Sequence, residues 1–228
     1  MFSERQIHAA KYIIKNLQIP EQFGPHDHDN MDVEDFIQEQ LPTYLKASVD
    51  SGVSKVVIIP ENFSFVIKIP FNGQFLWVED DDFSEECFFP YQQALPTGSF
   101  DYCARELDLI ERAQYFGWGF MVPDMQLLTY INGYPVYIQE KVRCGARGQT
   151  SNDSLERART IDRYYKQGPE DWRAAVIEKY GESIWCNFVD WCYSAPEDYN
   201  MLDDLHRSNV GITYDGRPVI LDVGGFGD

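Results

Sequence analysis

Three polar residues near the carboxyl end of the chain are spaced for chemistry on a hydroxyl group. Asp204 is followed by Asn209, and Asp222 comes directly after the apolar segment Val219 to Leu221. A carboxylate such as that of Asp204 can accept or orient the proton of an attacking hydroxyl. The amide oxygen of Asn209 and the carboxylate of Asp222 are hard ligands of the kind that magnesium prefers. The spacing therefore predicts a base and two magnesium ligands, which are the groups that phosphoryl transfer requires.

A lysine lies within an apolar segment far upstream of these residues. Val56 to Ile59 and Phe63 to Ile69 are two apolar runs separated by a Pro-Glu-Asn break, which predicts a hairpin. Lys68 belongs to the second run, and a cation in an apolar strand requires an anionic partner. If that strand instead lies at a sheet edge, Lys68 would point to solvent.

A helix that could supply this partner follows in the sequence. We expect Ser99 to cap it and Gly117 to end it. Its inward stripe, at helical spacing, consists of Cys103, Leu107 and Ile110. Glu106 borders this stripe and is the first candidate for the partner of Lys68, with Glu111 as the substitute. Either glutamate could also be a solvated helix carboxylate.

Further hairpins and helices are expected around these residues. Asn132-Gly133 is a strong turn signal and predicts a hairpin of 126–130 with 134–141. Tyr214 to Arg217 predicts the turn of the hairpin that leads to Asp222, and 143–154 is expected to be a polar linker. Helical patterns cover Phe2–Leu17, Val33–Leu45, Leu155–Tyr165, Glu170–Tyr180 and Ser183–Tyr193, and the last of these is expected to present the loop that contains Asp204.

The order of these signals resembles that of protein-kinase-like phosphotransferases. The resemblance rests on Val66-Ile67-Lys68, on the D-L-H-x-x-N pattern from Asp204 to Asn209, and on the strand that ends in Asp222. In layout the chain is similar to the early host-shutoff protein kinases of short-tailed coliphages. The similarity covers about residues 40–226, with an insertion between Lys68 and Glu106.

The resemblance implies an α+β, minimal two-lobed protein-kinase-like fold. Residues 1–142 would contain the leader helices and an antiparallel-sheet N-lobe, and residues 143–228 a reduced helical C-lobe. Six residues follow Asp222, whereas protein kinases continue from this position into an activation segment. We therefore expect the leader helices and the 155–193 helices to support the fold in place of the missing elements.

The resemblance also implies a site for ATP and Mg²⁺. Lys68 would reach the α- and β-phosphates, and Glu106 would hold Lys68 in place. Gly52 to Ser54 would be a reduced glycine-rich loop, with one glycine where kinases have three. Glu140 to Val142 would be the hinge whose backbone receives the adenine. Asp204 would be the catalytic base, with Asn209 and Asp222 as metal ligands.

The charge balance limits the possible partners. The chain has 37 acidic and 19 basic residues and a formal net charge of −18, which argues against a general nucleic-acid-binding surface. Part of the excess lies in Glu79 to Asp82 and in Glu85-Glu86. This segment is expected to be a solvated loop, with a docking surface for a basic protein as the alternative. His26-Asp27-His28 is expected to be an exposed loop rather than a metal site.

Two further observations concern the cellular location. The sequence has no apolar run long enough to span a membrane and no signal peptide. Its five cysteines form no C-x-x-C pair, which favours a reducing cytoplasm. The resemblance implies a phage protein that phosphorylates bacterial host proteins or itself. A small-molecule kinase and a non-catalytic, pseudokinase-like acidic protein that binds a host partner are the alternatives.

Overall fold

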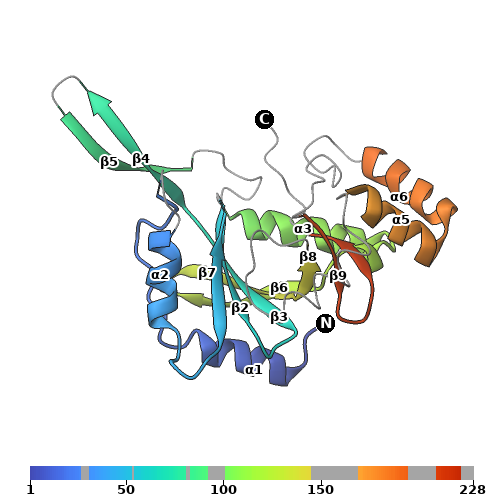
Figure 1. Ribbon diagram of the computed structural model, residues 1–228, viewed down its shortest axis with the longest axis horizontal. Helices are drawn as coiled ribbons and strands as arrows, with labels where there is room; N and C mark the ends of the chain where they lie inside the picture. The colour runs from blue at the N-terminus through green and yellow to red at the C-terminus, as the bar shows by residue number, and fades with distance from the viewer. Residues whose placement is uncertain are drawn as a thin grey trace. The chain divides into compact units, whose positions relative to one another are not determined.

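The computed structural model describes residues 1–26, 31–52, 54–80, 83–91, 101–144, 169–194 and 209–221 (Figure 1). The chain forms two compact units. The first contains residues 1–105 and 125–140, and the second contains residues 106–124 and 141–228. The fold belongs to the α+β class, with antiparallel sheets and several helices, as the sequence predicts.

The described elements follow one another along both units. The first elements along the chain are α1 (Glu4–Ile13), α2 (Met31–Gln40), β1 (Ala47–Ser51), β2 (Lys55–Pro60), β3 (Phe65–Pro70), β4 (Gly73–Asp80) and β5 (Phe83–Pro90). Next come α3 (Tyr102–Tyr115), η1 (Gly119–Met121), β6 (Met125–Ile131), β7 (Tyr134–Glu140) and β8 (Val142–Cys144). The last are α5 (Pro169–Tyr180), α6 (Glu182–Ser194), β9 (Val210–Thr213) and β10 (Pro218–Ile220).

A five-stranded antiparallel sheet forms the centre of the first unit. Its strand order is β1-β2-β3-β7-β6, so β3 is the middle strand. Both predicted hairpins are confirmed, because β2 pairs with β3 and β6 pairs with β7. Asn132 and Gly133 have φ angles of 52° and 86°, which is the left-handed conformation that a tight hairpin turn of this kind requires at both central residues.

One face of this sheet carries the hydrophobic core of the first unit. Ile13 of α1 and Ile37 of α2 belong to this core, as does Leu17, which follows α1, and both helices lie beside the sheet in Figure 1. The strands contribute alternate residues, as the period of two in a strand demands; these are Val56, Ile58, Phe65, Ile67, Ile69, Val136 and Ile138. The side chains of Ser3 and Gln6 cap α1 reciprocally. Both helices are shorter than the leader helices expected from the sequence.

Strands β4 and β5 form a separate two-stranded sheet that extends away from the five-stranded sheet (Figure 1). Its base is held by backbone bonds from Asn72 N to Phe23 O and from Phe75 N to Pro25 O, both 2.9 Å. A Cβ on Gly24 would lie 2.1 Å from the carbonyl oxygen of Gly73, so the two backbones meet where no side chain fits. The expectation of a loop for the acidic run is wrong for Glu79-Asp80, which end β4, and for Glu85-Glu86, which belong to β5; Asp81 and Asp82 lie outside the described residues.

The second unit combines a small sheet with helices rich in aromatic residues. Its strand order is β10-β9-β8, all antiparallel. The core-helix prediction for 183–193 is confirmed by α6, which buries Trp185, Phe188 and Cys192. Trp185 meets Trp172 of α5 at 5.7 Å between ring centroids. The expected linker at 143–154 is partly wrong because Arg143 and Cys144 belong to β8; the rest of it, and the helix expected at Leu155–Tyr165, lie outside the described residues.

Candidate functional site

Lys68 lies in the middle of the five-stranded sheet rather than at its edge. Only 5% of the residue is exposed, so the alternative of a solvent-facing lysine is wrong. In the antiparallel ladder Lys68 is directly opposite Val57 on one side and Tyr137 on the other. Residues opposite each other in a sheet project from the same face. Lys68 and Tyr137 therefore share the face opposite to Ile67 and the hydrophobic core.

This second sheet face is buried and carries polar side chains among apolar ones such as Val66. Besides Lys68 and Tyr137 it includes Gln139, which follows Tyr137 by two residues and is also buried. Gln139 Nε2 donates to the sulfur of Met125 at 3.8 Å. Burying a neutral polar group without a hydrogen-bond partner costs on the order of 2–7 kcal/mol. Burying an ammonium group costs several kcal/mol unless an anion or polar groups compensate it. The polar side chains on this face therefore require compensating partners within the fold.

Asp101 connects this face to the first turn of α3. Its carboxylate accepts a hydrogen bond from the hydroxyl of Tyr137 and another, of 2.9 Å, from the backbone N–H of Ala104. Asp101 is therefore the residue that caps α3, and the expectation that Ser99 does so is wrong, since α3 begins at Tyr102. Burial raises the pKa of Asp101, while the Tyr137 and backbone hydrogen bonds oppose this rise.

Glu106 is the inward-facing glutamate of α3. It is 1% exposed, whereas Glu111 is exposed to solvent, so the substitute candidate and the solvated interpretation of Glu106 are not supported. The inward stripe runs through Cys103, Glu106, Ile110 and Ala113, all buried, and Leu107 is only half-buried. The sequence therefore identified the helix and two members of the stripe but placed Glu106 at its border rather than within it. Gly117 follows the helix with a φ of 85°, which agrees with the predicted end.

The proposed phosphate loop is the turn between β1 and β2. Gly52 N donates to Lys55 O at 3.0 Å and closes the turn. Among the described residues, no atom would lie within 4 Å of a Cβ added to Gly52, so the space over this glycine is open with respect to them. Ser54 is buried, and its carbonyl accepts from Phe71 N at 2.8 Å. Gly52 directly follows the last residue of β1, and its contact with ATP phosphates stays a prediction.

The expected hinge lies between two strands. Glu140 is the last residue of β7, Val142 is the first of β8, and the buried Lys141 joins them. Lys141 itself belongs to neither strand. Whether its backbone receives an adenine stays a prediction.

Asn209 lies at the start of the predicted C-terminal hairpin. It is 5% exposed, and its carbonyl oxygen accepts from Leu221 N at 2.7 Å. The β9–β10 hairpin is therefore confirmed, and it closes so that the backbones of Asn209 and Leu221 are bonded to each other. Asp222 follows Leu221 in the sequence but, like Asp204, lies outside the described residues.

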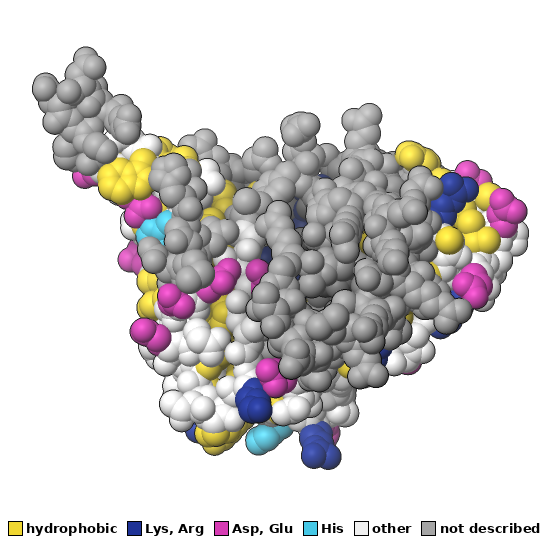
Figure 2. Space-filling model, in the orientation of Figure 1, with side chains coloured by type: hydrophobic (Ala, Val, Ile, Leu, Met, Phe, Trp, Pro, Cys, Tyr) yellow, Lys and Arg dark blue, Asp and Glu magenta, His cyan; other side chains and the backbone are white. Residues whose placement is uncertain are grey.

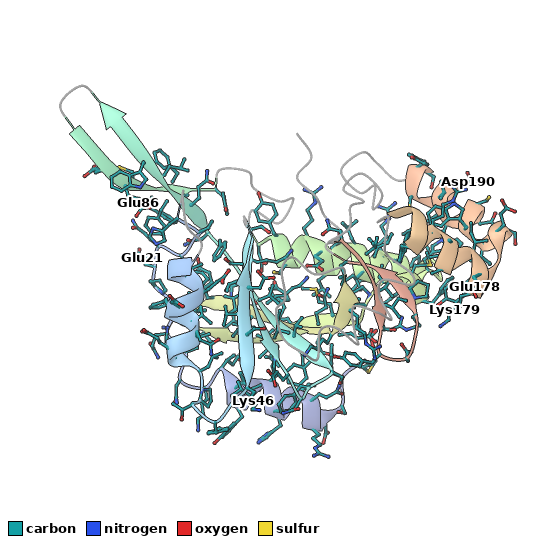
Figure 3. The ribbon with its side chains drawn as sticks, viewed as in Figure 1. Glu21, Lys46, Glu86, Glu178, Lys179 and Asp190 are labelled. Carbon is teal, nitrogen blue, oxygen red and sulfur yellow. The ribbon has the colours of Figure 1, made fainter. Side chains whose placement is uncertain are left out.

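Basic side chains hold the turn of this hairpin. Lys179 of α5, labelled in Figure 3, donates to the carbonyl of Gly216, and Arg143 of β8 lies 4.5 Å from the ring centroid of Tyr214. Arg217 forms an ion pair with Asp215 at 3.3 Å. The hydrogen bond from the Thr213 hydroxyl is the largest cause of the lowered pKa of Asp215. These contacts come from α5, from β8 and from within the turn itself, so the hairpin that begins at Asn209 is held at its far end.

His26 was expected to be exposed but packs against the base of the β4–β5 hairpin. Its ring stacks on Phe75 with 4.6 Å between centroids, and its Nδ1 lies 2.8 Å from Glu86 Oε2. Glu86 is labelled on this hairpin in Figure 3. Among the described residues, no group of three or more His, Cys, Asp or Glu side chains is arranged to hold a metal ion.

Asp101 and Tyr137 were not indicated by the sequence pattern. The available signals were an aspartate three residues before Ala104, which is the spacing of a helix cap, and the alternation of Tyr137 and Gln139 with apolar residues in β7. A cavity of about 530 Å³ also occurs in the first unit, between α1 and residues 42–45. None of the predicted site residues lines that cavity, whose walls include Arg5, His8, Tyr12, Tyr44 and Phe63.

Comparison with models of protein families, with characterised proteins and with solved structures finds no match to this chain. Within the part of the chain that the structure describes, none of the helices has the length and apolar character to cross a lipid bilayer. Among the described residues, Cys87, Cys103, Cys186 and Cys192 form no disulfide bond.

Proposed function

We propose that this protein is an ATP- and magnesium-dependent phosphotransferase with a minimal, two-lobed, protein-kinase-like fold. The first unit would be the nucleotide-binding lobe and the second the reduced helical lobe. The observation that carries the proposal is the position of Lys68, buried in the third strand of a five-stranded antiparallel sheet. In protein kinases the lysine that contacts the ATP phosphates lies in the third strand.

The nucleotide would be bound mainly by the first unit. Lys68 would contact the α- and β-phosphates, and Glu106 would pair with Lys68 and hold it in position. The turn at Gly52 and Ser54 would cover the phosphates, which is consistent with the open space over Gly52. Glu140 and Val142 would provide backbone groups for the adenine.

The second unit would supply the base and the metal ligands. Asp204 would accept the proton of the attacking hydroxyl. The oxygen of that hydroxyl would form a bond to the γ-phosphorus while the bond to ADP breaks and ADP leaves. Asn209 and Asp222 would hold Mg²⁺ between the phosphates, since both offer hard oxygen atoms. The bond between Asn209 O and Leu221 N supports this pairing, because it brings together the chain segments that carry the two ligands.

The acceptor would be a serine or threonine hydroxyl of a protein, either a bacterial host protein or this protein itself. This choice, and the cytoplasm as the place of action, follow from the resemblance to phage host-shutoff kinases. A small-molecule kinase is the alternative enzyme. Incubation with γ-labelled ATP and Mg²⁺, with and without a bacterial lysate, separates these cases. Label on lysate proteins supports the host-directed kinase, label on the chain alone supports autophosphorylation, and label only on small molecules supports the alternative.

Ligand-induced stabilisation tests the nucleotide site directly. Mg²⁺-ATP at 100 times its dissociation constant should stabilise the protein by about 2.7 kcal/mol, seen as a rise in melting temperature. Lys68→Met should lose this rise, because methionine fills similar space without the charge. Lys46→Met, which removes an exposed lysine, is the control and should keep it. An equal rise in the Lys68 variant would refute the lysine assignment.

Substitution of the two predicted aspartates should have different effects on ATP binding and on turnover. Asp222→Asn should weaken Mg²⁺-dependent ATP binding and abolish transfer together, since it removes a carboxylate from the metal. Asp204→Asn should bind Mg²⁺-ATP almost normally but turn over on the order of 100-fold more slowly, the usual range for losing a general base. Measuring ATP affinity and turnover for both variants distinguishes a metal ligand from a base.

A second candidate function is a non-catalytic protein that captures a basic partner. The β4–β5 hairpin supports it, because the segment from Gly73 to Tyr91 contains six acidic and no basic residues. The same hairpin exposes large apolar side chains, with Trp77 49% and Phe89 42% exposed. Figure 2 shows hydrophobic and acidic side chains together at the base of this hairpin. Exposed apolar groups with charges of one sign are typical of a surface that binds a partner of opposite charge.

Expression in a bacterial host distinguishes this binding function from catalysis. Suppose growth inhibition persists at full strength in both Asp204→Asn and Asp222→Asn but disappears when Asp80, Asp81 and Asp82 are changed to asparagine. The acidic binding protein would then be the better account. The kinase proposal predicts the reverse pattern, with inhibition lost in the first two variants.

A further inference from the structure

We infer that Asp101 and Tyr137 form a positioning pair that fixes the start of α3 on the strand next to Lys68. The inference rests on the proposed function, because it assigns a task to residues that surround the proposed phosphate-binding lysine. Neither residue would touch the nucleotide or the reacting atoms. Their effect on ATP would be exerted through Lys68 and through the helix that carries Glu106.

Tyr137 is the lateral neighbour of Lys68. The two residues are directly opposite in the β3–β7 ladder, and such pairs have Cβ atoms about 4.5–5.5 Å apart on the same sheet face. Tyr137 is buried, so its ring limits the space in which the lysine side chain can move. A shift of this ring would therefore change the space available to the Lys68 side chain.

Asp101 joins this strand to the helix with a single carboxylate. One oxygen, Oδ2, accepts from the Tyr137 hydroxyl, and the other, Oδ1, accepts from Ala104 N in the first turn of α3. The two bonded residues Asp101 and Tyr137 are 36 positions apart in the sequence. Because both are buried, water does not compete well for these bonds.

This arrangement does more than a helix cap requires. Capping α3 needs only one acceptor oxygen, which serine, threonine or asparagine could also provide. The second oxygen of Asp101 adds a fixed point on β7, so the start of α3 cannot shift along the sheet without breaking the Tyr137 bond. If the bond is lost, Lys68 and α3 occupy more positions, and ATP binding must select the competent one at a cost in affinity.

Matched removal of two hydroxyl groups tests the inference. Tyr137→Phe removes the bonded hydroxyl. Tyr134→Phe, in the same strand, removes a buried hydroxyl that has no hydrogen-bond partner within the described structure. Each variant is compared with the wild type by circular dichroism and at a temperature where it is fully folded. Mg²⁺-ATP affinity should fall at least roughly fivefold in Tyr137→Phe and should be unchanged in Tyr134→Phe.

A double-mutant cycle separates positioning from general weakening of the fold. In a Lys68→Met background, adding Tyr137→Phe should cause no further loss of residual Mg²⁺-ATP affinity, because the residue being positioned is gone. Asp101→Asn keeps an acceptor for Ala104 N and a hydrogen-bonding group for Tyr137, so it should retain most of the affinity. Asp101→Ala should lose affinity as Tyr137→Phe does.

The results distinguish failure of this inference from failure of the proposed function. Loss of affinity in Lys68→Met with normal affinity in Tyr137→Phe would overturn the positioning pair alone. Additive losses in the double variant would also overturn it, since they indicate an effect that does not act through Lys68. If the wild-type protein does not bind Mg²⁺-ATP, or if Lys68→Met binds it normally, the proposed function and this inference both fall.

Discussion

Asp101 is a buried carboxylate whose ionisation is linked to folding. Burial raises its pKa above the ordinary value, in spite of the Tyr137 hydrogen bond. A raised pKa in the folded state means that the residue contributes stability below the ordinary aspartate pKa of about 4. This contribution is lost as the pH rises through the folded-state pKa.

The difference in stability between wild type and Asp101→Asn should therefore depend on pH. Asparagine does not titrate, while the other carboxylates are common to both proteins and cancel in the comparison. From about pH 3 to about pH 7 the stability of Asp101→Asn should increase relative to wild type. Urea unfolding of both proteins across this range measures the difference. A difference that is flat with pH would show that Asp101 titrates normally in the folded protein.

The Tyr137 hydroxyl should also contribute to stability itself. Tyr137→Phe leaves the buried Asp101 with one donor fewer, which should cost about 1–3 kcal/mol of unfolding free energy. Tyr134→Phe removes a buried hydroxyl without a described partner and should change stability by less than about 0.5 kcal/mol. Denaturant unfolding at constant m-value measures both effects. Equal losses in the two variants would indicate that the hydroxyls act through packing alone.

Two loop glycines of the first unit differ in how closely other backbone atoms approach them. Gly24 is needed for folding, because its Cβ would lie 2.1 Å from Gly73 O at the base of the β4–β5 hairpin. Gly52 is not, since a Cβ there would meet no atom of the described part of the chain within 4 Å. The open space at Gly52 is consistent with a ligand that approaches the backbone closely.

Alanine substitutions at these glycines should therefore have opposite effects. Gly24→Ala should destabilise the protein by about 1–3 kcal/mol through overpacking. Its Mg²⁺-ATP affinity should stay normal at temperatures where it is folded. Gly52→Ala should leave the melting temperature unchanged and weaken Mg²⁺-ATP binding. Normal ATP affinity in Gly52→Ala would show that the β1–β2 turn does not cover the phosphates.

The whole chain carries a large excess of negative charge. With a net charge of −18, the folded state experiences self-repulsion, which salt screens over a Debye length of about 10 Å at 0.1 M. Raising NaCl from about 20 to about 200 mM should therefore increase the melting temperature by roughly 2–4 °C. Changing Asp80, Asp81 and Asp82 to asparagine should reduce this salt response. A melting temperature that falls with salt would mean that attractive ion pairs outweigh the repulsion.

Much of the local structure could be predicted because its causes are local. The Asn132-Gly133 turn, the apolar runs of β2 and β3, and the Trp185 and Phe188 stripe of α6 are each determined by neighbours within a few residues. The N-terminal boundary of α3 was wrong for a related reason. Ser99 and Asp101 are both good capping residues, and only the contact of Asp101 with Tyr137, from a distant strand, favours the later start.

The sequence alone determined the α+β class, the hairpins and the helix that carries Glu106. Tertiary structure decided the strand order, which places β3 in the middle of the sheet and so buries Lys68. It also decided that Glu106 rather than Glu111 is buried and that Tyr137 bonds to Asp101. The physical reason is that turns and periodicity act over a few residues, whereas burial depends on which distant segments pack together, and the chain pattern does not specify those neighbours.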